Sequence, residues 1–214
     1  MIFKTADCAD FADFTLIFFQ LLNMNYNILS FKETVKINLS NAFKDVDNWF
    51  EKPANLRQFR PQNGGWTIDE ILEHIYLTNH FLLIIIEKGA TKSVKNSLDL
   101  HLNNMPVDYD FPIEKLNEIG IHKSFNWMRP EHMEPLGKYP LSILRENLKN
   151  QLAQCSFVLN KIQNGEGVLQ TTMMSVNNLG KIDVYSYLYF LAKHAERHIS
   201  QIQKNEMAYI SKTD

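Results

Sequence analysis

Apolar residues recur at spacings of three and four along four long stretches of the chain, with charged residues between them. The first stretch covers residues 30–52, and the others cover residues 67–89, 140–165 and 181–208. A period of 3.6 residues places such positions on one face of an α-helix. The pattern therefore predicts four amphipathic helices that pack around a common core.

Capping and helix-ending residues indicate where these helices begin and end. Thr67 is a candidate N-cap, and Glu70 follows it three residues later, which is the spacing of a capping box. Gly89 is expected to end the same helix, and the third helix is expected to begin at Pro140 and end at Gly165. The runs "IIIE" and "VYSYLYF" contain strong strand formers, but the longer helical period around each run favours helix.

The stretch between the second and third predicted helices, residues 90–138, is too long for a tight helical hairpin. It is rich in Pro, Asn and charged residues, and "IEKLNEIGIHKSF" within it is typical of a short helical turn. We expect a long crossover here and a second, shorter loop at residues 166–180. The predicted fold is all-α, a four-helix bundle over residues 28–207, with a C-terminal tail at 208–214.

Two histidines of the last predicted helix, His194 and His198, share one face because they lie four residues apart. On a helical wheel they lie at the edge of the apolar stripe, together with Tyr187 and Gln201, whereas Glu196 and Arg197 fall away from its centre. The stripe itself consists of Val184, Leu188, Leu191, Ala195 and Ile202. Both side chains should therefore flank the buried seam of the bundle.

The second predicted helix carries a histidine in an equivalent place. His74 lies at the edge of its apolar stripe near Thr78, whereas His80 lies on the far side. This stripe consists of Ile68, Ile71, Ile75, Leu82 and Ile86, and the remaining histidines (His101, His122 and His132) lie in the long connection. If the two helices are neighbours, His74, His194 and His198 can meet at one point.

The sequence leaves two interpretations of these three histidines open. They can be ordinary hydrogen-bonded residues at the margin of a core, since an HxxxH spacing is common. They can also bind a divalent metal such as zinc or nickel, and three protein ligands with an open position are typical of a catalytic site. "HAERH" is not HExxH, so the zinc-protease mechanism of that motif is excluded.

Several other polar side chains are candidates to support such a site. Position on the wheels or in the chain makes Glu70, Glu73, Tyr187 and Gln201 candidates for orienting the imidazoles. For Glu70 we favour the capping box. Trp66 is expected to be a packing anchor rather than a group that stacks on substrate. Glu131 and His132 are expected to be exposed loop residues, although they could reach a site.

The composition narrows the class of protein. The chain has 22 basic and 24 acidic residues, and this balance gives no reason to expect nucleic acid or an anionic membrane as a partner. Cys8 and Cys155 are far apart and form no CxxC, which fits a reducing, cytoplasmic setting without a disulfide framework. Cys155 lies in a helical stretch and is expected to be a buried, inert thiol.

The N-terminal residues 1–27 are expected to be an extension of the domain. Residues 11–22 are apolar but contain Asp13, and they are too short to span a bilayer. They also make a poor signal peptide, because few basic residues precede them. Met24 is an alternative start for the domain. We expect no stable membrane anchoring, and the alternative is an anchor formed by residues 11–22.

Three segments together resemble the DinB-like superfamily over about residues 28–207. "GGWTIDEILEHIYLTNHFL" is similar to its second helix, where a Trp precedes E-x-L-x-H, and "PLGKYPLSILRENLKNQL" resembles its third helix. "LGKIDVYSYLYFLAKHAERHISQI" resembles its last helix, with F-x-x-x-H-x-x-R-H-x-x-Q-I. The resemblance implies an up-down-down-up bundle and a metal-binding histidine triad at His74, His194 and His198, the residues that the wheels bring together. The long connection and residues 1–23 depart from the family pattern.

The family resemblance implies enzymes that act on small molecules. Members include S-transferases that use bacillithiol or another low-molecular-weight thiol, and proteins described as metal-dependent hydrolases. A metal-bound thiolate would serve the transfer, and a metal-bound hydroxide would serve the hydrolysis. The triad alone therefore does not choose between the two reactions. The alternative is a non-catalytic bundle, possible as a homodimer, with a structural or vestigial metal site.

Overall fold

The computed structural model describes residues 26–98, 108–126 and 130–213. The apolar segment 11–22, the alternative start at Met24, and His101 lie outside the described residues. None of the described helices contains a stretch both long enough and apolar enough to cross a bilayer.

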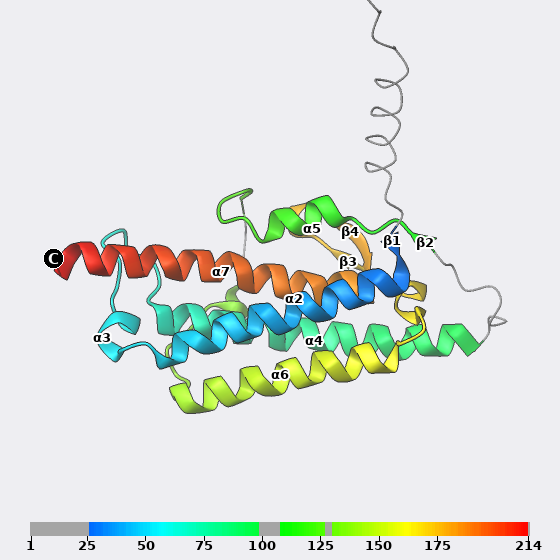
Figure 1. Ribbon diagram of the computed structural model, residues 1–214, viewed down its shortest axis with the longest axis horizontal. Helices are drawn as coiled ribbons and strands as arrows, with labels where there is room; N and C mark the ends of the chain where they lie inside the picture. The colour runs from blue at the N-terminus through cyan, green and yellow to red at the C-terminus, as the bar shows by residue number, and fades with distance from the viewer. Residues whose placement is uncertain (1–25, 99–107, 127–129, 214) are drawn as a thin grey trace, which may run out of the picture.

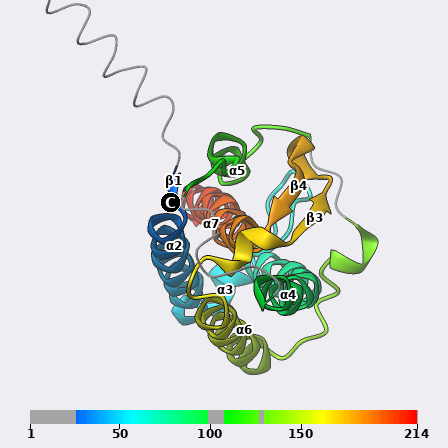
Figure 2. The same ribbon diagram turned by 90° about the vertical axis from the view of Figure 1, so that its right-hand side faces the viewer.

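Four long helices form the body of the molecule (Figure 1). They are α2 (Ile28–Asn48), α4 (Ile68–Leu98), α6 (Leu141–Lys161) and α7 (Val184–Thr213). In Figure 1, α2 and α7 run toward the left and α4 and α6 run toward the right. Seen from one end, in Figure 2, the helices surround a common core, with α7 packed against both α2 and α4. The prediction of an all-α four-helix bundle is confirmed.

Short elements lie at the ends of the bundle and within the crossover. A 3₁₀ turn (Trp49–Glu51) and α3 (Ala54–Arg57) follow α2, and β1 (Tyr26–Asn27) pairs antiparallel with β2 (Asp108–Tyr109). The crossover contains α5 (Ile113–Ile119), which lies on α7, and a 3₁₀ turn (Glu131–Met133) that packs on α4. The helical turn expected in "IEKLNEIGIHKSF" is therefore confirmed as α5.

The predicted apolar stripes are the core of the bundle. All five stripe residues named for the second helix, and all five named for the last, are buried. The α2 stripe is buried too, and it consists of Phe31, Val35, Leu39, Ala42, Phe43 and Val46. Each fully buried aliphatic or aromatic side chain contributes about 1.5–3 kcal/mol of hydrophobic stabilisation. Periodicity alone thus located the surface that holds the helices together.

Helix α4 starts as predicted but ends later than predicted. Thr67 and Glu70 form the capping box, with the Thr67 N–H donating to Glu70 Oε2 (2.8 Å) and the Glu70 N–H to Thr67 Oγ1 (3.2 Å). The prediction that Gly89 ends the helix is wrong, because the helix continues to Leu98. A Cβ on Gly89 would lie 3.2 Å from Val184 Cγ2. Gly89 therefore allows the first turn of α7 to approach α4 closely.

The segment before α7 forms a β-hairpin that the sequence did not predict. Strands β3 (Thr171–Met174) and β4 (Gly180–Asp183) pair antiparallel, with Thr171 opposite Asp183. The expected loop at 166–180 and the expected helix start at 181 are both corrected by this finding. The third predicted helix also ends earlier than Gly165, at Lys161.

Asp183 connects the hairpin to α7 by capping the helix. Its fully buried carboxylate accepts hydrogen bonds from the backbone N–H groups of Tyr185 (2.9 Å) and Ser186 (3.1 Å) and from Ser186 Oγ (2.5 Å). These are N–H groups that a helix start otherwise leaves without a partner. The position where α7 begins is therefore fixed by the hairpin.

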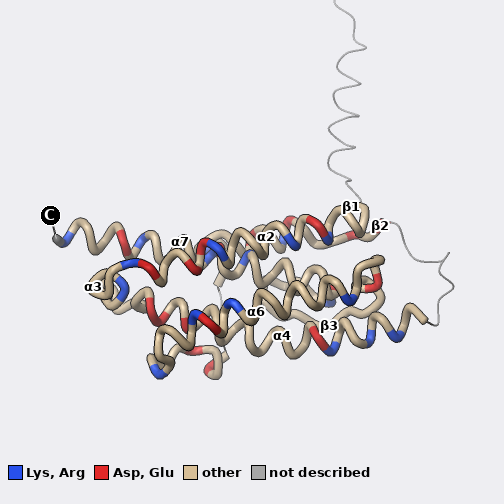
Figure 3. Tube along the Cα trace, turned by 60° about the horizontal axis from the view of Figure 1, so that its bottom comes forward, with Lys and Arg blue, Asp and Glu red and all other residues tan. Residues whose placement is uncertain are grey.

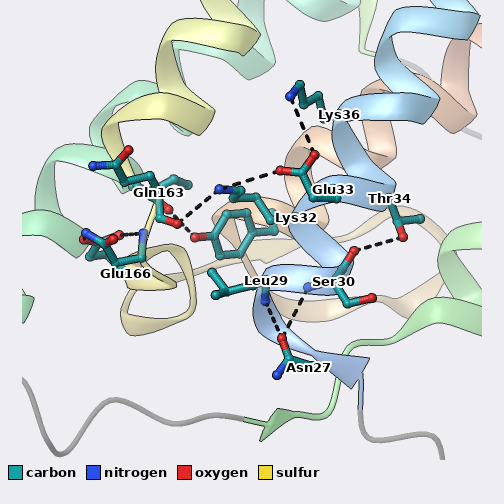
Figure 4. Close-up of polar contacts among 12 residues, drawn as sticks. Asn27, Leu29, Ser30, Lys32, Glu33, Thr34, Lys36, Gln163 and Glu166 are labelled. Carbon is teal, nitrogen blue, oxygen red and sulfur yellow. Dashed lines mark hydrogen bonds and ion pairs between the residues drawn. The ribbon is translucent and has the colours of Figure 1, made fainter.

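Helix α2 is fixed at its start in a similar way (Figure 4). Asn27 Oδ1 accepts hydrogen bonds from the N–H groups of Leu29 (3.0 Å) and Ser30 (3.3 Å), and Lys32 Nζ donates to the Gln163 carbonyl (3.1 Å) just beyond α6. Charged residues of both signs are spread along the helices (Figure 3). This distribution agrees with the balanced composition.

Candidate metal centre

Three histidines from two helices meet inside the bundle. His74 of α4 and His194 and His198 of α7 each offer one ring nitrogen, and these nitrogens all lie within 4.8 Å of one another. The Nε2 atoms of His194 and His198 are 3.1 Å apart, and the His74 ring lies edge-on to both of the other rings. The geometry brings together the three residues that the wheels placed at the seam.

The three rings are buried, and burial lowers the pKa of the two on α7. The exposed fraction is 4% for His74, 1% for His194 and 8% for His198. Desolvation lowers the pKa of His194 and His198 well below the usual value near 6.5, and the neighbouring imidazoles lower it further. Both rings are therefore neutral at pH 7, which is the form that binds a metal.

His198 is oriented from within its own helix. Its Nδ1–H donates to Oε1 of Gln201, 3.0 Å away and one turn further along α7. Because Nδ1 carries the proton, the lone pair is on Nε2, which faces His194. The candidate role of Gln201 as an orienting partner is borne out by this bond.

His74 is oriented by a segment that is distant in the sequence. Its Nδ1 lies 2.7 Å from the carbonyl oxygen of Met133, which can only accept, so Nδ1 is the protonated nitrogen. The adjacent Glu73 holds the same segment, accepting hydrogen bonds from the N–H groups of Leu136 (3.0 Å) and Gly137 (2.7 Å). Glu73 thus supports His74 indirectly, by docking the crossover that supplies the carbonyl.

The donor set fits a divalent metal ion. At a metal–nitrogen distance of about 2.1 Å, two cis imidazole nitrogens lie about 3.0–3.4 Å apart, and the His194–His198 separation of 3.1 Å is in this range. Two of the rings have Nδ1 engaged in hydrogen bonds, which leaves Nε2 for a metal. Within the described residues, three side chains lie close enough together to bind one metal ion. Further positions on an ion would therefore be left for water or substrate.

A pocket of about 320 Å³ opens beside the histidines. His74 and His198 line it, and so do the backbone of Gly64 and Gly65 and the ring of Trp66. The Trp66 ring centroid lies 4.8 Å from that of His74, and Trp66 also packs against the core. The pocket is large enough to bring a small molecule into contact with two of the three rings.

The crossover supplies a pocket residue that sequence reasoning missed. His122 lines the pocket together with Gln201 and Arg197. Arg197 Nη1 donates to the Ile121 carbonyl and to Ser124 Oγ (3.3 Å), so it holds the turn that carries His122. Arg197 is 8% exposed because this turn covers it, although the wheel placed it away from the stripe centre. The only sequence signal for His122 was its location in the long connection.

The remaining candidates lie away from the three rings or have other partners. Tyr187 donates its hydroxyl to the Met173 carbonyl (2.8 Å), and Glu70 is engaged in the capping box and with Arg60. Glu131 and His132 are exposed, as expected for loop residues. Cys155 is fully buried, and burial raises the pKa of its thiol to about 12, as expected for an inert cysteine.

Comparison with known protein families gives a match that spans the three histidines. A family model described as the DinB superfamily matches residues 40–202, which include all three histidines. The chain has no significant match among curated proteins or among solved structures. The family match covers more than half of the chain and includes the parts of α4 and α7 that form the centre.

Proposed function

The chain belongs to the DinB superfamily, and from this premise and the three converging histidines we propose that it is a metal-dependent thiol S-transferase or a related enzyme. Its substrates would be small molecules, one of them a low-molecular-weight thiol. The observation that carries the proposal is the pocket, which reaches His74 and His198 directly. A structural metal site has no need of such an opening.

In such a reaction, some residues would bind the metal and others would orient the metal ligands. His74, His194 and His198 would hold zinc or nickel, with Met133 and Gln201 keeping two of the rings in the metal-binding tautomer. A bound divalent ion would lower the pKa of a thiol and so supply thiolate at neutral pH. In the transfer, the sulfur forms a bond to an electrophilic carbon, the leaving group departs with its electron pair, and the thiol proton goes to water.

In this proposal, two parts of the pocket wall would limit the access of water to the reacting sulfur. The Trp66 ring covers one side of the pocket next to His74, and the turn at residues 121–124 covers another. Partial enclosure of this kind strengthens the electrostatic effect of charges inside the site. A hydrolytic reaction at the same triad is the related activity, and it would need water in place of the thiol.

The test combines metal analysis with a thiol-dependent assay. The full chain, purified without a histidine tag, should retain about one metal ion per chain and accelerate bond formation between a small thiol and monochlorobimane, which releases chloride. His198→Ala should abolish both properties. His132→Ala is the matched control, because His132 is an exposed histidine whose ring packs on Phe81. Metal content far below one per chain would overturn the proposal.

A further inference from the structure

The pocket beside the histidines has a marked charge asymmetry. Its described lining includes the cationic Arg197 and no Asp or Glu side chain. Arg197 Nη1 donates hydrogen bonds to the Ile121 carbonyl and the Ser124 hydroxyl, both uncharged acceptors. The guanidinium also lies over the Phe125 ring, 5.0 Å from its centroid, which fixes its position.

His122 is another side chain that lines the pocket, and its ring makes no hydrogen bond within the described part of the chain. Burial, followed by the charges of Lys204, Arg197 and Lys123, lowers the pKa of His122. The neutral imidazole of His122 can donate a hydrogen bond to a ligand in the pocket.

We infer that this pocket is selective for an anionic small molecule, whose carboxylate or equivalent anion lies against Arg197 and His122. Resting on the proposed function, the inference adds that the thiol end of that molecule points toward His74 and His198. Three neutral imidazoles do not offset the charge of a bound divalent ion, so the ion and Arg197 favour an anion together. A carboxylate accepts charge-assisted hydrogen bonds from a guanidinium, and a neutral alcohol does not form bonds of that strength.

The experiment compares two thiols of the same chain length, one ending in a carboxylate and the other in a neutral hydroxyl group. The metal-loaded full chain is titrated by calorimetry with 3-mercaptopropionate and with 3-mercaptopropan-1-ol. The anionic thiol should bind about 10- to 100-fold more tightly, the range expected for one hydrogen bond to a charged group. The preference should decrease as salt is added, because salt screens the attraction between the anionic thiol and the cationic groups around the pocket.

Variants connect the preference to named residues. Arg197→Gln should reduce the affinity ratio toward one, and the double variant Lys123→Gln/Lys204→Gln, which leaves the clamp on residues 121–124 intact, should reduce it by a smaller factor. The double variant keeps the test valid if Arg197→Gln fails to fold. Lys149→Gln is the control for a lost positive charge, because Lys149 lies on α6 and its side chain is 56% exposed. This control should leave the ratio unchanged.

The outcomes separate the two proposals. Equal affinities for the two thiols, or a preference that all of these variants leave intact, would overturn the anion selectivity and leave the thiol chemistry standing. If neither thiol binds, the proposed function fails. The selectivity is then tested by titrating the protein with succinate and with butane-1,4-diol. The Trp66 fluorescence is obtained by subtracting the signal of the Trp66→Phe variant. A saturable response to succinate alone, lost in Arg197→Gln, supports it, and equal responses overturn it.

Discussion

The two helices that supply the candidate metal ligands hold them in different ways. On α7, His198 is oriented by Gln201, one turn away in the same helix. On α4, His74 is oriented by the Met133 carbonyl, which reaches it from the crossover and is held there by Glu73. One arrangement follows from the helix itself, and the other requires the correct docking of a long connection. The difference indicates that support for His74 can be weakened without changing any of the three histidines.

The largest effect on metal affinity is expected from removing an imidazole ring from α4 or from α7. His74→Ala and His194→Ala should each reduce metal affinity by more than the about 10- to 100-fold that loss of an orienting partner costs. Metal competition with a chromophoric chelator measures the affinity. His80→Ala on the outer face of α4 is the control and should bind metal normally. If His74→Ala retains the wild-type affinity, α4 is not part of the centre.

The buried α7 pair should also make the metal-free protein sensitive to acid. Burial lowers the pKa of His194 and His198, so the folded state keeps them neutral while the unfolded chain takes up protons below about pH 6.5. The unfolded state then binds more protons, and the free energy of unfolding falls as the pH falls. From pH 7.5 to 5.5 the loss should be about 2–3 kcal/mol for the pair.

Urea denaturation of the metal-free chain at the two pH values measures this loss. His198→Gln removes one of the two groups and should reduce the pH dependence by about half. A free energy of unfolding that stays constant between the two pH values would show that the rings are not held neutral in the fold.

Loosening the crossover should weaken metal binding although no ligand is changed. In Glu73→Gln the side chain keeps a single oxygen for the N–H groups of Leu136 and Gly137, so the segment that positions Met133 is less firmly held. We expect metal affinity to fall about 10- to 100-fold, as for other outer partners. Glu70→Gln is the control, because it weakens the helix cap on the same helix without touching the crossover. Equal metal affinities in the two variants would contradict the role of Glu73.

The smallest effect on metal affinity is expected from the loss of the Gln201 side chain. Gln201→Ala removes the acceptor for His198 Nδ1, but the residue lines the pocket, where water can replace the lost oxygen. Metal affinity should fall by about tenfold or less. The same chelator competition compares this variant with Glu73→Gln. A larger loss at Gln201 than at Glu73 would reverse the comparison between the two helices.

Helical periodicity predicted the parts of the site that depend on local geometry. His194, His198 and Gln201 share a helix, so spacing alone places them on one face. His74 was placed at the seam by the same reasoning, because its helix carries a clear apolar stripe. The interaction of Glu73 with Leu136 and Gly137 joins segments far apart in the chain, and no pattern in the sequence encodes such a contact.

The missed features share this non-local origin. His122 reaches the pocket because Arg197 holds residues 121–124 against α7, and the wheel showed only that Arg197 lies off the apolar stripe. The β3–β4 hairpin was also missed, since each of its strands has four residues and too few positions to show an alternating pattern. Gly89 was misread because a glycine that permits close helix packing looks the same in sequence as one that ends a helix.

The buried Asp183 cap also determines the rotational phase of α7. His194 follows it by roughly three turns, so the direction in which both α7 imidazoles point is set by where the hairpin ends. Inserting one residue between Asp183 and His194 would turn both rings by about 100° around the helix axis. The hairpin, which contributes no side chain to the triad, therefore acts as the angular reference for two of its three rings.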